Sequence, residues 1–152
     1  MTYVAPLQDM RFVMRELAGL AEIQRLPGFE DATDDTVAAV LQENARFNCE
    51  IIAPLNRTGD LQPAIWQHGR VTTTPGFREA FRAFVEGGWQ GVQHPVAYGG
   101  QGLPKLVATA CMEMVNAANL SFALCPLLTD GAIEALLTAG SEEQKQLFVP
   151  PL

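Results

Sequence analysis

The sequence contains few of the residues that usually bind metal ions or nucleic acids. It has two histidines, His68 and His94, and no CxxC, HxxxH or HExxH spacing, so a metal site is not expected. Its ten lysines and arginines are scattered along the chain, and the formal net charge is −7. Because phosphate binding needs clustered basic residues, this composition argues against nucleic acid as a partner.

Cysteine is also scarce. The three cysteines, Cys49, Cys111 and Cys125, are odd in number and far apart, and no signal-peptide pattern occurs at the N-terminus. These features predict free thiols in a reducing compartment, which we take to be the cytoplasm. Each cysteine lies on an apolar helical stripe, where a buried, inert thiol is expected more often than the nucleophile of a Cys–His pair.

Long uninterrupted hydrophobic runs are absent. The longest apolar stretch, residues 120–139, contains Pro126, Asp130, Gly131 and Glu134, so a buried helix is expected there and not a membrane span. Apolar residues make up 48% of the chain and charged residues 18%, which excludes the disordered and fibrous classes. A chain of 152 residues with this composition predicts one globular domain.

Apolar residues recur at three- and four-residue intervals in six segments, whereas alternating strand patterns are nearly absent. Asp9 is the expected N-cap of the first helix, which stops near Leu26. In the second helix, Pro54 is expected to cause a kink and residues 56–59 to end the helix. The connection 60–74 mixes proline and glycine with a short β-branched run that can form a strand-like stretch.

Four more helices are expected in the remainder of the chain. Thr74 as N-cap and Pro75 at the first helical position begin the third, and Pro104 begins the fourth. The fifth is predicted over residues 126–139, and the sixth follows the capping box Ser141–Gln144. The aromatic residues on these stripes are expected in the core. The fold class is therefore all-α, a bundle of about six helices with one elaborate loop.

That loop is glycine-rich and reads GWQGVQHPVAYGGQG over residues 88–102. No strand precedes it and its glycine spacing does not fit a dinucleotide fingerprint, while the Leu-Pro-Lys-Leu that follows is not a Gly-Lys-Ser/Thr phosphate motif. We therefore expect a docking turn. Its glycines allow positive φ and close backbone approach, and Trp89, Val92 and Tyr98 fill gaps between helices.

Adjacent carboxylates raise the question of acid–base chemistry. The pairs Glu30–Asp31, Asp34–Asp35 and Glu142–Glu143 lie at helix starts, where the helix dipole already explains them. Asp130 and Glu134 differ, because their four-residue spacing within an apolar stretch places them on one helix face. Two interpretations stay open for these two residues: a solvated edge, or a polar patch beside an apolar pocket.

Two longer stretches carry a resemblance: GWQGVQHPVAYGGQGLP at 88–104 and GSEEQKQLFVPPL at 140–152. In this order they resemble the N-terminal helical domain of the acyl-CoA dehydrogenases, which shows Gly-Trp-x-Gly, Pro-x-x-Tyr-Gly-Gly-x-Gly, two helices and Gly-Thr/Ser-Glu-Glu-Gln-Lys. Val96–Ala97 stand where acids are common in that family. Further stretches, APLQDMRFVMREL, APLNRTGD and TPGFREAF, are similar to its larger bacterial branch, which includes methylthiopropanoyl-CoA dehydrogenases.

The resemblance implies that residues 1–152 are one domain of a longer enzyme, which adds a middle β domain and a C-terminal helical domain. Such an enzyme uses FAD for the α,β-dehydrogenation of an acyl-CoA thioester, and a Glu removes the α-proton. Neither this base nor the main flavin-contacting residues of the family can be assigned to any residue of the present chain. No catalytic, cofactor-binding or metal-binding residue is therefore assigned, and the 152 residues alone are expected to be inactive. The implied partners are acyl-CoA, further copies of the full-length chain, and electron-transfer flavoprotein or a similar acceptor.

The resemblance also implies part of the wall of an acyl pocket. The turn at 98–102 and the helix around 122–129 are similar to elements at the acyl-chain end of that pocket. The substrate-pocket residues assigned in this way are Tyr98, Gly99, Gly100, Phe122, Cys125, Leu128 and Thr129. Cys125 and Thr129 are small enough to set the depth of the pocket. The alternative function is a stand-alone helical module that binds acyl chains or another protein.

Overall fold

The longest helical column of the molecule has three parts that follow one another without a break. In the computed structural model, which describes residues 3–152, these parts are α3 (Asp34–Phe47), the π-helical turn η2 (Asn48–Ile52) and α4 (Ala53–Leu61). Thr33 caps the column by accepting a hydrogen bond from the Thr36 amide. The wide π turn ends at Ile52, two residues before Pro54, and accommodates the missing N–H of this proline, so the column continues. The prediction that residues 56–59 end this helix was wrong.

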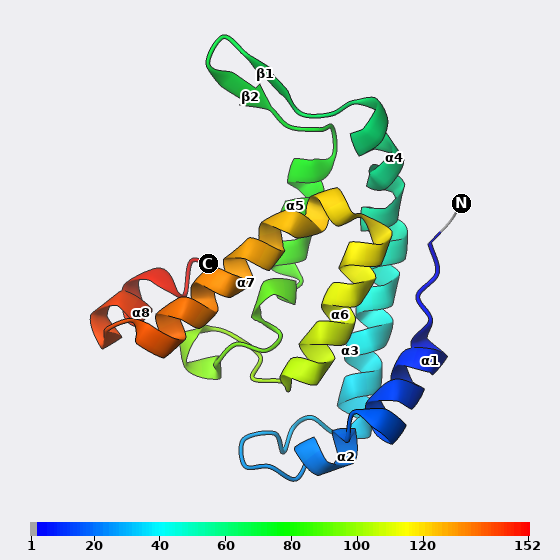
Figure 1. Ribbon diagram of the computed structural model, residues 1–152, viewed down its shortest axis with the longest axis vertical. Coiled ribbons are helices and arrows are strands. Elements are labelled where there is room, and N and C mark those ends of the chain that lie inside the picture. Colours follow the sequence, from blue (N-terminus) through cyan, green and yellow to red (C-terminus); the bar gives the residue numbers. More distant parts are fainter. Residues whose placement is uncertain (1–2) are drawn as a thin grey trace.

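The N-terminal segment lies along α3 as short helical pieces (Figure 1). They are α1 (Leu7–Phe12), the π-helical turn η1 (Val13–Leu17) and α2 (Leu20–Ile23). The first helix begins after Pro6, whose carbonyl accepts a hydrogen bond from the Met10 amide, so the prediction of Asp9 as N-cap was wrong. Gly19, with φ of 69°, turns the chain between η1 and α2.

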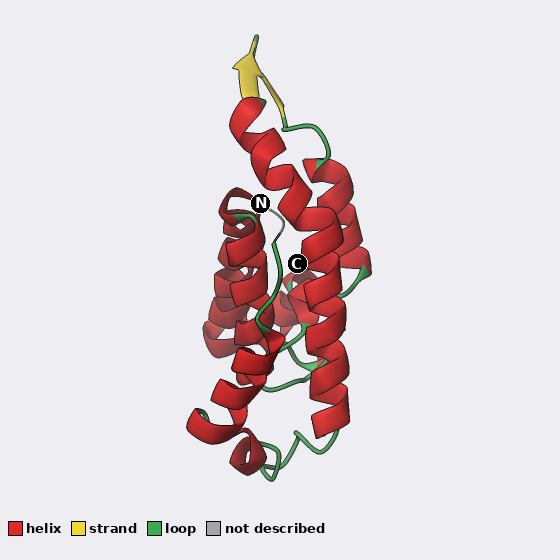
Figure 2. Cartoon of the chain, turned by 90° about the vertical axis from the view of Figure 1, so that its right-hand side faces the viewer, coloured by secondary structure: helices red, strands yellow, loops and turns green. Residues whose placement is uncertain are grey.

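The connection after α4 forms a two-stranded antiparallel hairpin of β1 (Ile65–Gln67) and β2 (Arg70–Thr72), which confirms the expected strand-like stretch. His68 and Gly69 form its two-residue turn, with φ of 50° and 75°. The hairpin projects from one end of the helices in both views (Figures 1 and 2). All six of its strand residues are exposed.

Helix α5 (Phe77–Glu86) follows Gly76, so the predicted start at Thr74 and Pro75 was two residues early. The Thr74 hydroxyl does not cap this helix, because it donates a hydrogen bond to the Gln62 carbonyl. Gly76 takes the N-cap position with φ of 85°. The expected end of the helix at Gly87 is confirmed.

The glycine-rich loop contains two short 3-10 turns, η3 (Trp89–Gly91) and η4 (Val96–Tyr98). The amides of residues 99–102 are used inside the loop, where they donate to the carbonyls of Val96, Pro95, Gly91 and His94 respectively. A Cβ atom on Gly100 would collide with the main-chain carbonyl of His94. The loop is therefore the close-approach docking turn that its sequence predicted, with Val92 buried beneath it.

The last three helices are α6 (Lys105–Ala118), α7 (Leu120–Ala139) and α8 (Glu142–Phe148). Helix α7 begins at Leu120, so the prediction of a start near Pro126 was wrong. Its start is fixed by Asn119, whose side-chain oxygen accepts a hydrogen bond from the Phe122 amide, and Pro126 is buried inside the helix. The capping box of Ser141 and Gln144 is confirmed.

Two clusters of buried side chains hold these helices together. One lies between α1, α3 and α6 and includes Met10, Leu41 and Met114. The other joins η2, α5, α6 and α7 and is rich in aromatic rings. Helices from both halves of the chain contribute to each cluster, so the architecture is the all-α bundle expected from the sequence, with the hairpin added.

Helix α7 is long and apolar enough to cross a membrane, judged by length and composition alone. In this fold it packs against α6 and is tied to neighbouring segments by its acidic residues. Gln93 donates a hydrogen bond to Asp130, and Lys105 pairs with Glu134 at 3.3 Å. These contacts make the helix part of the bundle, but only 22% of its apolar window is buried, so the expectation of a buried helix was wrong.

The close approach at Gly100 leads to a prediction. Gly100→Ala should lower the free energy of unfolding by about 1–3 kcal/mol, because the added methyl group meets main-chain atoms that cannot rotate away. The matched control is Gly131→Ala in α7, where a Cβ meets nothing within 4 Å. This control should raise the free energy of unfolding by up to about 1 kcal/mol. Urea unfolding measures both values, and equal stability of the two variants would contradict the docking-turn interpretation.

Candidate functional site

An apolar groove lies between α5, α7 and the hairpin, and we call it the hairpin groove. Its volume is about 620 Å³. Its lining residues come from β2 and the segment after it, from α5 and from the start of α7: Val71, Thr72, Thr73, Phe77, Arg78, Phe81, Ser121, Phe122 and Cys125. No carboxylate is among them, so Arg78 supplies the only formal charge of this lining.

Aromatic packing builds the floor of the hairpin groove. Phe122 of α7 is 4% exposed and meets Phe77 and Phe84 of α5 edge to face, with ring centroids 6.0 and 5.9 Å apart. Phe81 lies one turn from Phe77 and has its ring centroid 6.4 Å from that of Phe122. At 39% exposure, Phe81 also faces solvent, so the expectation that it lies in the core was wrong.

A second groove, which we call the terminal groove, lies where the glycine-rich loop meets the chain after α8. Its volume is about 270 Å³, and its lining includes residues 98–101, Ile133 and residues 149–152. Phe81 lines this groove too, so it joins the two grooves along α5. On α7, residues 122, 125, 129 and 133 follow one another at three- and four-residue spacing and therefore lie on one side of the helix.

The structure distributes the sequence-predicted pocket residues over this surface. Phe122 and Cys125 line the hairpin groove, whereas residues 98–100 line the terminal groove. Thr129 lies one turn after Cys125 and donates a hydrogen bond to its carbonyl. Thr129 and Leu128 both lie outside the linings of the two grooves, and Leu128 is 74% exposed. The sequence analysis did not identify the hairpin residues or Phe81 as part of a groove. Phe81 lies on an apolar helical stripe, and this pattern does not indicate that one edge of its ring is exposed.

The three cysteines differ in their surroundings. Cys111 is 4% exposed, and burial raises the pKa of its thiol to about 12, as expected for an inert cysteine. Cys49 is partly buried and its Sγ lies 3.2 Å from the Tyr3 carbonyl oxygen. Cys125 is exposed at the hairpin groove, so the expectation that it is buried was wrong.

The acidic residues have structural partners. Asp34 at the start of α3 contacts Arg15 and accepts a hydrogen bond from Gln24, and this hydrogen bond lowers the pKa of the Asp34 carboxyl. Asp130 is three-quarters buried, accepts from Gln93 and has an oxygen 2.9 Å from His94 Nε2. Asp130 thus ties α7 to the glycine-rich loop, and because it also lines a cavity with apolar walls, it fits the polar patch beside an apolar pocket that was considered from the sequence.

No cluster of three or more potential metal-ligating side chains occurs within residues 3–152. The amides of residues 99–102 donate within the loop, which leaves no row of free N–H groups there for a phosphate. The two grooves therefore provide an apolar surface beside the glycine-rich turn.

Comparisons with known proteins agree with the sequence resemblance. Residues 59–152 match the family described as "Acyl-CoA dehydrogenase, N-terminal domain". Over all 152 residues, the chain is 43% identical to the 3-methylmercaptopropionyl-CoA dehydrogenase of Ruegeria pomeroyi. The chain spans 26% of the length of that protein.

The contrast between the cysteines leads to a second prediction. With iodoacetamide at pH 8, Cys125 should be alkylated at least about a hundredfold faster than Cys111, because a thiol with a pKa of about 12 is almost entirely protonated and this one is also buried. Mass spectrometry of the separate peptides gives both rates. In urea the two rates should become similar. Fast alkylation of Cys111 in the folded protein would contradict the packing around α6.

Proposed function

The chain belongs to the acyl-CoA dehydrogenase family as its N-terminal helical domain, and from this we propose that it works within an FAD-dependent enzyme that dehydrogenates an acyl-CoA thioester between its α and β carbons. Within that enzyme, this domain would supply one wall of the pocket for the acyl chain. The observation that carries the proposal is the apolar hairpin groove between α5 and α7.

The groove suits an acyl chain on physical grounds. Each methylene group removed from water contributes about 0.8 kcal/mol to binding, provided that its surroundings are apolar. Phe77, Phe81 and Phe122 provide such surroundings on two helices that are packed against each other. Cys125 and Thr129, at successive turns of α7, have small side chains and would set how deep a chain reaches.

The chemical groups for dehydrogenation would come from outside these residues. The hairpin groove has no carboxylate to take an α-proton, and the glycine-rich loop uses its amides internally. The glycine-rich loop therefore does not fit the pyrophosphate of FAD. We infer that a middle β domain and a C-terminal helical domain hold the flavin and the base, and that residues 1–152 alone are inactive.

The substrate and partners follow as further parts of the proposal. The Ruegeria relative is named for 3-methylmercaptopropionyl-CoA, and by analogy we propose a short thioether acyl chain as the substrate class. We also propose that the full-length enzyme is a cytoplasmic homo-oligomer and passes electrons to electron-transfer flavoprotein or a similar acceptor. Tyr98, Gly99 and Gly100 would support the pocket from the terminal groove, and Leu128 from the exposed side of α7.

The first test compares the 152 residues with the enzyme that contains the further domains. The longer protein should be yellow from bound flavin and should oxidise a short acyl-CoA with an artificial electron acceptor. The 152 residues alone should be colourless and show no oxidation. A longer protein that binds no flavin would defeat the dehydrogenase assignment. A colourless, folded 152-residue monomer that binds acyl chains tightly by itself would favour the stand-alone module.

The second test concerns the depth of the pocket. In the full enzyme, Cys125→Phe should lower kcat/KM for an eight-carbon acyl-CoA at least about tenfold relative to a three-carbon one, because the new ring displaces two or more methylene groups. The matched control is Ala135→Phe, an exposed position of α7 outside both groove linings. An unchanged chain-length preference for Cys125→Phe would remove the hairpin groove from the acyl pocket.

A further inference from the structure

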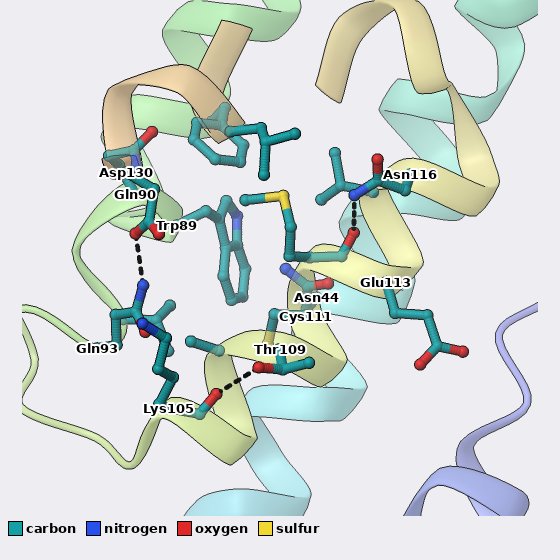
Figure 3. Close-up of a pocket in the computed structure, with 16 residues that line it drawn as sticks. Asn44, Trp89, Gln90, Gln93, Lys105, Thr109, Cys111, Glu113, Asn116 and Asp130 are labelled. Carbon is teal, nitrogen blue, oxygen red and sulfur yellow. Dashed lines mark hydrogen bonds between the residues drawn. The ribbon is translucent and has the colours of Figure 1, made fainter. Parts of the chain in front are cut away.

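A third cavity lies apart from the hairpin groove, between α3, α6, α7 and the start of the glycine-rich loop (Figure 3). We call it the Asn44 pocket. Its volume is about 460 Å³, which is within the range of cavities that hold small organic molecules. Neither the acyl groove nor the chemistry proposed above uses this cavity.

The floor of the pocket carries an unpaired hydrogen-bond donor. Asn44 is fully buried, and Asn48 donates through Nδ2 to both its main-chain carbonyl and its side-chain Oδ1, each at 2.8 Å. Only the side-chain nitrogen of Asn48 can donate to the Asn44 carbonyl, so the orientation of the Asn48 amide is determined. The Asn44 side chain must then present its oxygen to this nitrogen, which determines the Asn44 orientation too. Asn44 Nδ2 consequently points away from Asn48 and has no hydrogen-bond partner among residues 3–152.

This donor lies at the closed inner end of the pocket that Asn44 lines, where almost none of its surface is accessible to solvent. Figure 3 shows the Asn44 side chain on the α3 side of the pocket, with its nitrogen turned towards Trp89. Buried polar groups without a partner are uncommon in folded proteins and call for an explanation, which a bound molecule can supply. A single ordered water would satisfy Asn44 but would leave most of a cavity of 460 Å³ unfilled.

The walls and the mouth of the pocket differ in chemistry. The walls are apolar and include Trp89, Met112, Val115 and Leu127. At the mouth, three side-chain amides donate to groups of the protein, which leaves their oxygen atoms as acceptors: Gln90 donates to the Pro126 carbonyl, Gln93 to Asp130 and Asn116 to the Met112 carbonyl.

The charges at the mouth select against anions. Asp130 and Glu113 both line the pocket, and the one cation of the lining, Lys105, is paired with Glu134. A ligand that matches these groups is therefore not an anion, and it needs no positive charge because Asp130 already accepts a hydrogen bond from Gln93. It accepts a hydrogen bond at its inner end, donates one at its outer end and has an apolar body that packs against an indole ring.

We propose that the Asn44 pocket binds a small, neutral, planar amide, whose carbonyl oxygen accepts a hydrogen bond from Asn44 Nδ2 and whose N–H groups donate to Asp130 and the amide oxygens at the mouth. The site is separate from the acyl groove, so its occupancy does not depend on the proposed dehydrogenase function.

Benzamide is a suitable probe, with toluene and benzoate as matched compounds that lack the hydrogen-bonding groups or carry a negative charge. In ¹⁵N-labelled protein, benzamide should shift the indole signal of Trp89 in a saturable way and leave that of Trp66 on the exposed hairpin unchanged. Affinity for benzamide should exceed that for toluene and for benzoate by about tenfold. Equal affinities for benzamide and toluene, or no saturable shift of Trp89, would overturn the proposal.

Two variants locate the binding. Asn44→Leu keeps the branched shape of the side chain at a somewhat larger volume, leaves Asn48 its main-chain partner and should reduce benzamide affinity to the level of toluene. Ala108→Phe fills the cavity from the half-buried face of α6 and should abolish binding, whereas Ala117→Phe on the exposed face of the same helix should not. Thermal unfolding verifies that each variant is folded. If Asn44→Leu fails to fold, Ala108→Phe alone tests the location of the site. Benzamide binding that persists in Ala108→Phe would show that the ligand binds elsewhere and would overturn the proposal.

Discussion

The packing of Phe122 against the phenylalanines of α5 is the interaction on which both grooves depend. Helix α7 has twenty residues, yet few of them are buried: Phe122, Ala123, Pro126 and Ile133. Phe122 supplies the aromatic contact between α7 and α5, in addition to the packing of α7 against α6 and α4. Its edge-to-face contacts with Phe77 and Phe84 hold these two helices together, and neighbouring residues of both helices line the grooves.

The polar contacts of α7 with the glycine-rich loop lie towards the middle of the helix. Asp130 holds Gln93 and lies beside His94, and Gln90 donates to the carbonyl of Pro126. The glycine-rich loop is thereby fixed to the helix that the aromatic cluster has already positioned. Because the loop also uses its own amides internally, it is rigid for reasons of backbone packing and needs no bound phosphate.

Much of this fold could be predicted from the sequence, and the failures have identifiable physical causes. The capping box at Ser141 and the all-α class were predicted from local pattern, because each depends on residues that are neighbours in the chain. The start of α7 was missed because the cap at Asn119 outweighs the usual effect of Pro126. The exposed edge of Phe81 and the unpaired amide of Asn44 depend on contacts between distant segments, and no local pattern indicates them.

The π-helical turn η2 has a further consequence for the column of α3 and α4. A turn that holds an extra residue offsets the helix faces on its two sides, since one residue corresponds to a rotation of about 100°. Leu41 before the turn is in one buried cluster, and Ile52 at its end is in the other. One uninterrupted rod therefore contributes to two separate cores, and loss of a single codon within η2 would rotate everything that follows it out of alignment with α5 and α7.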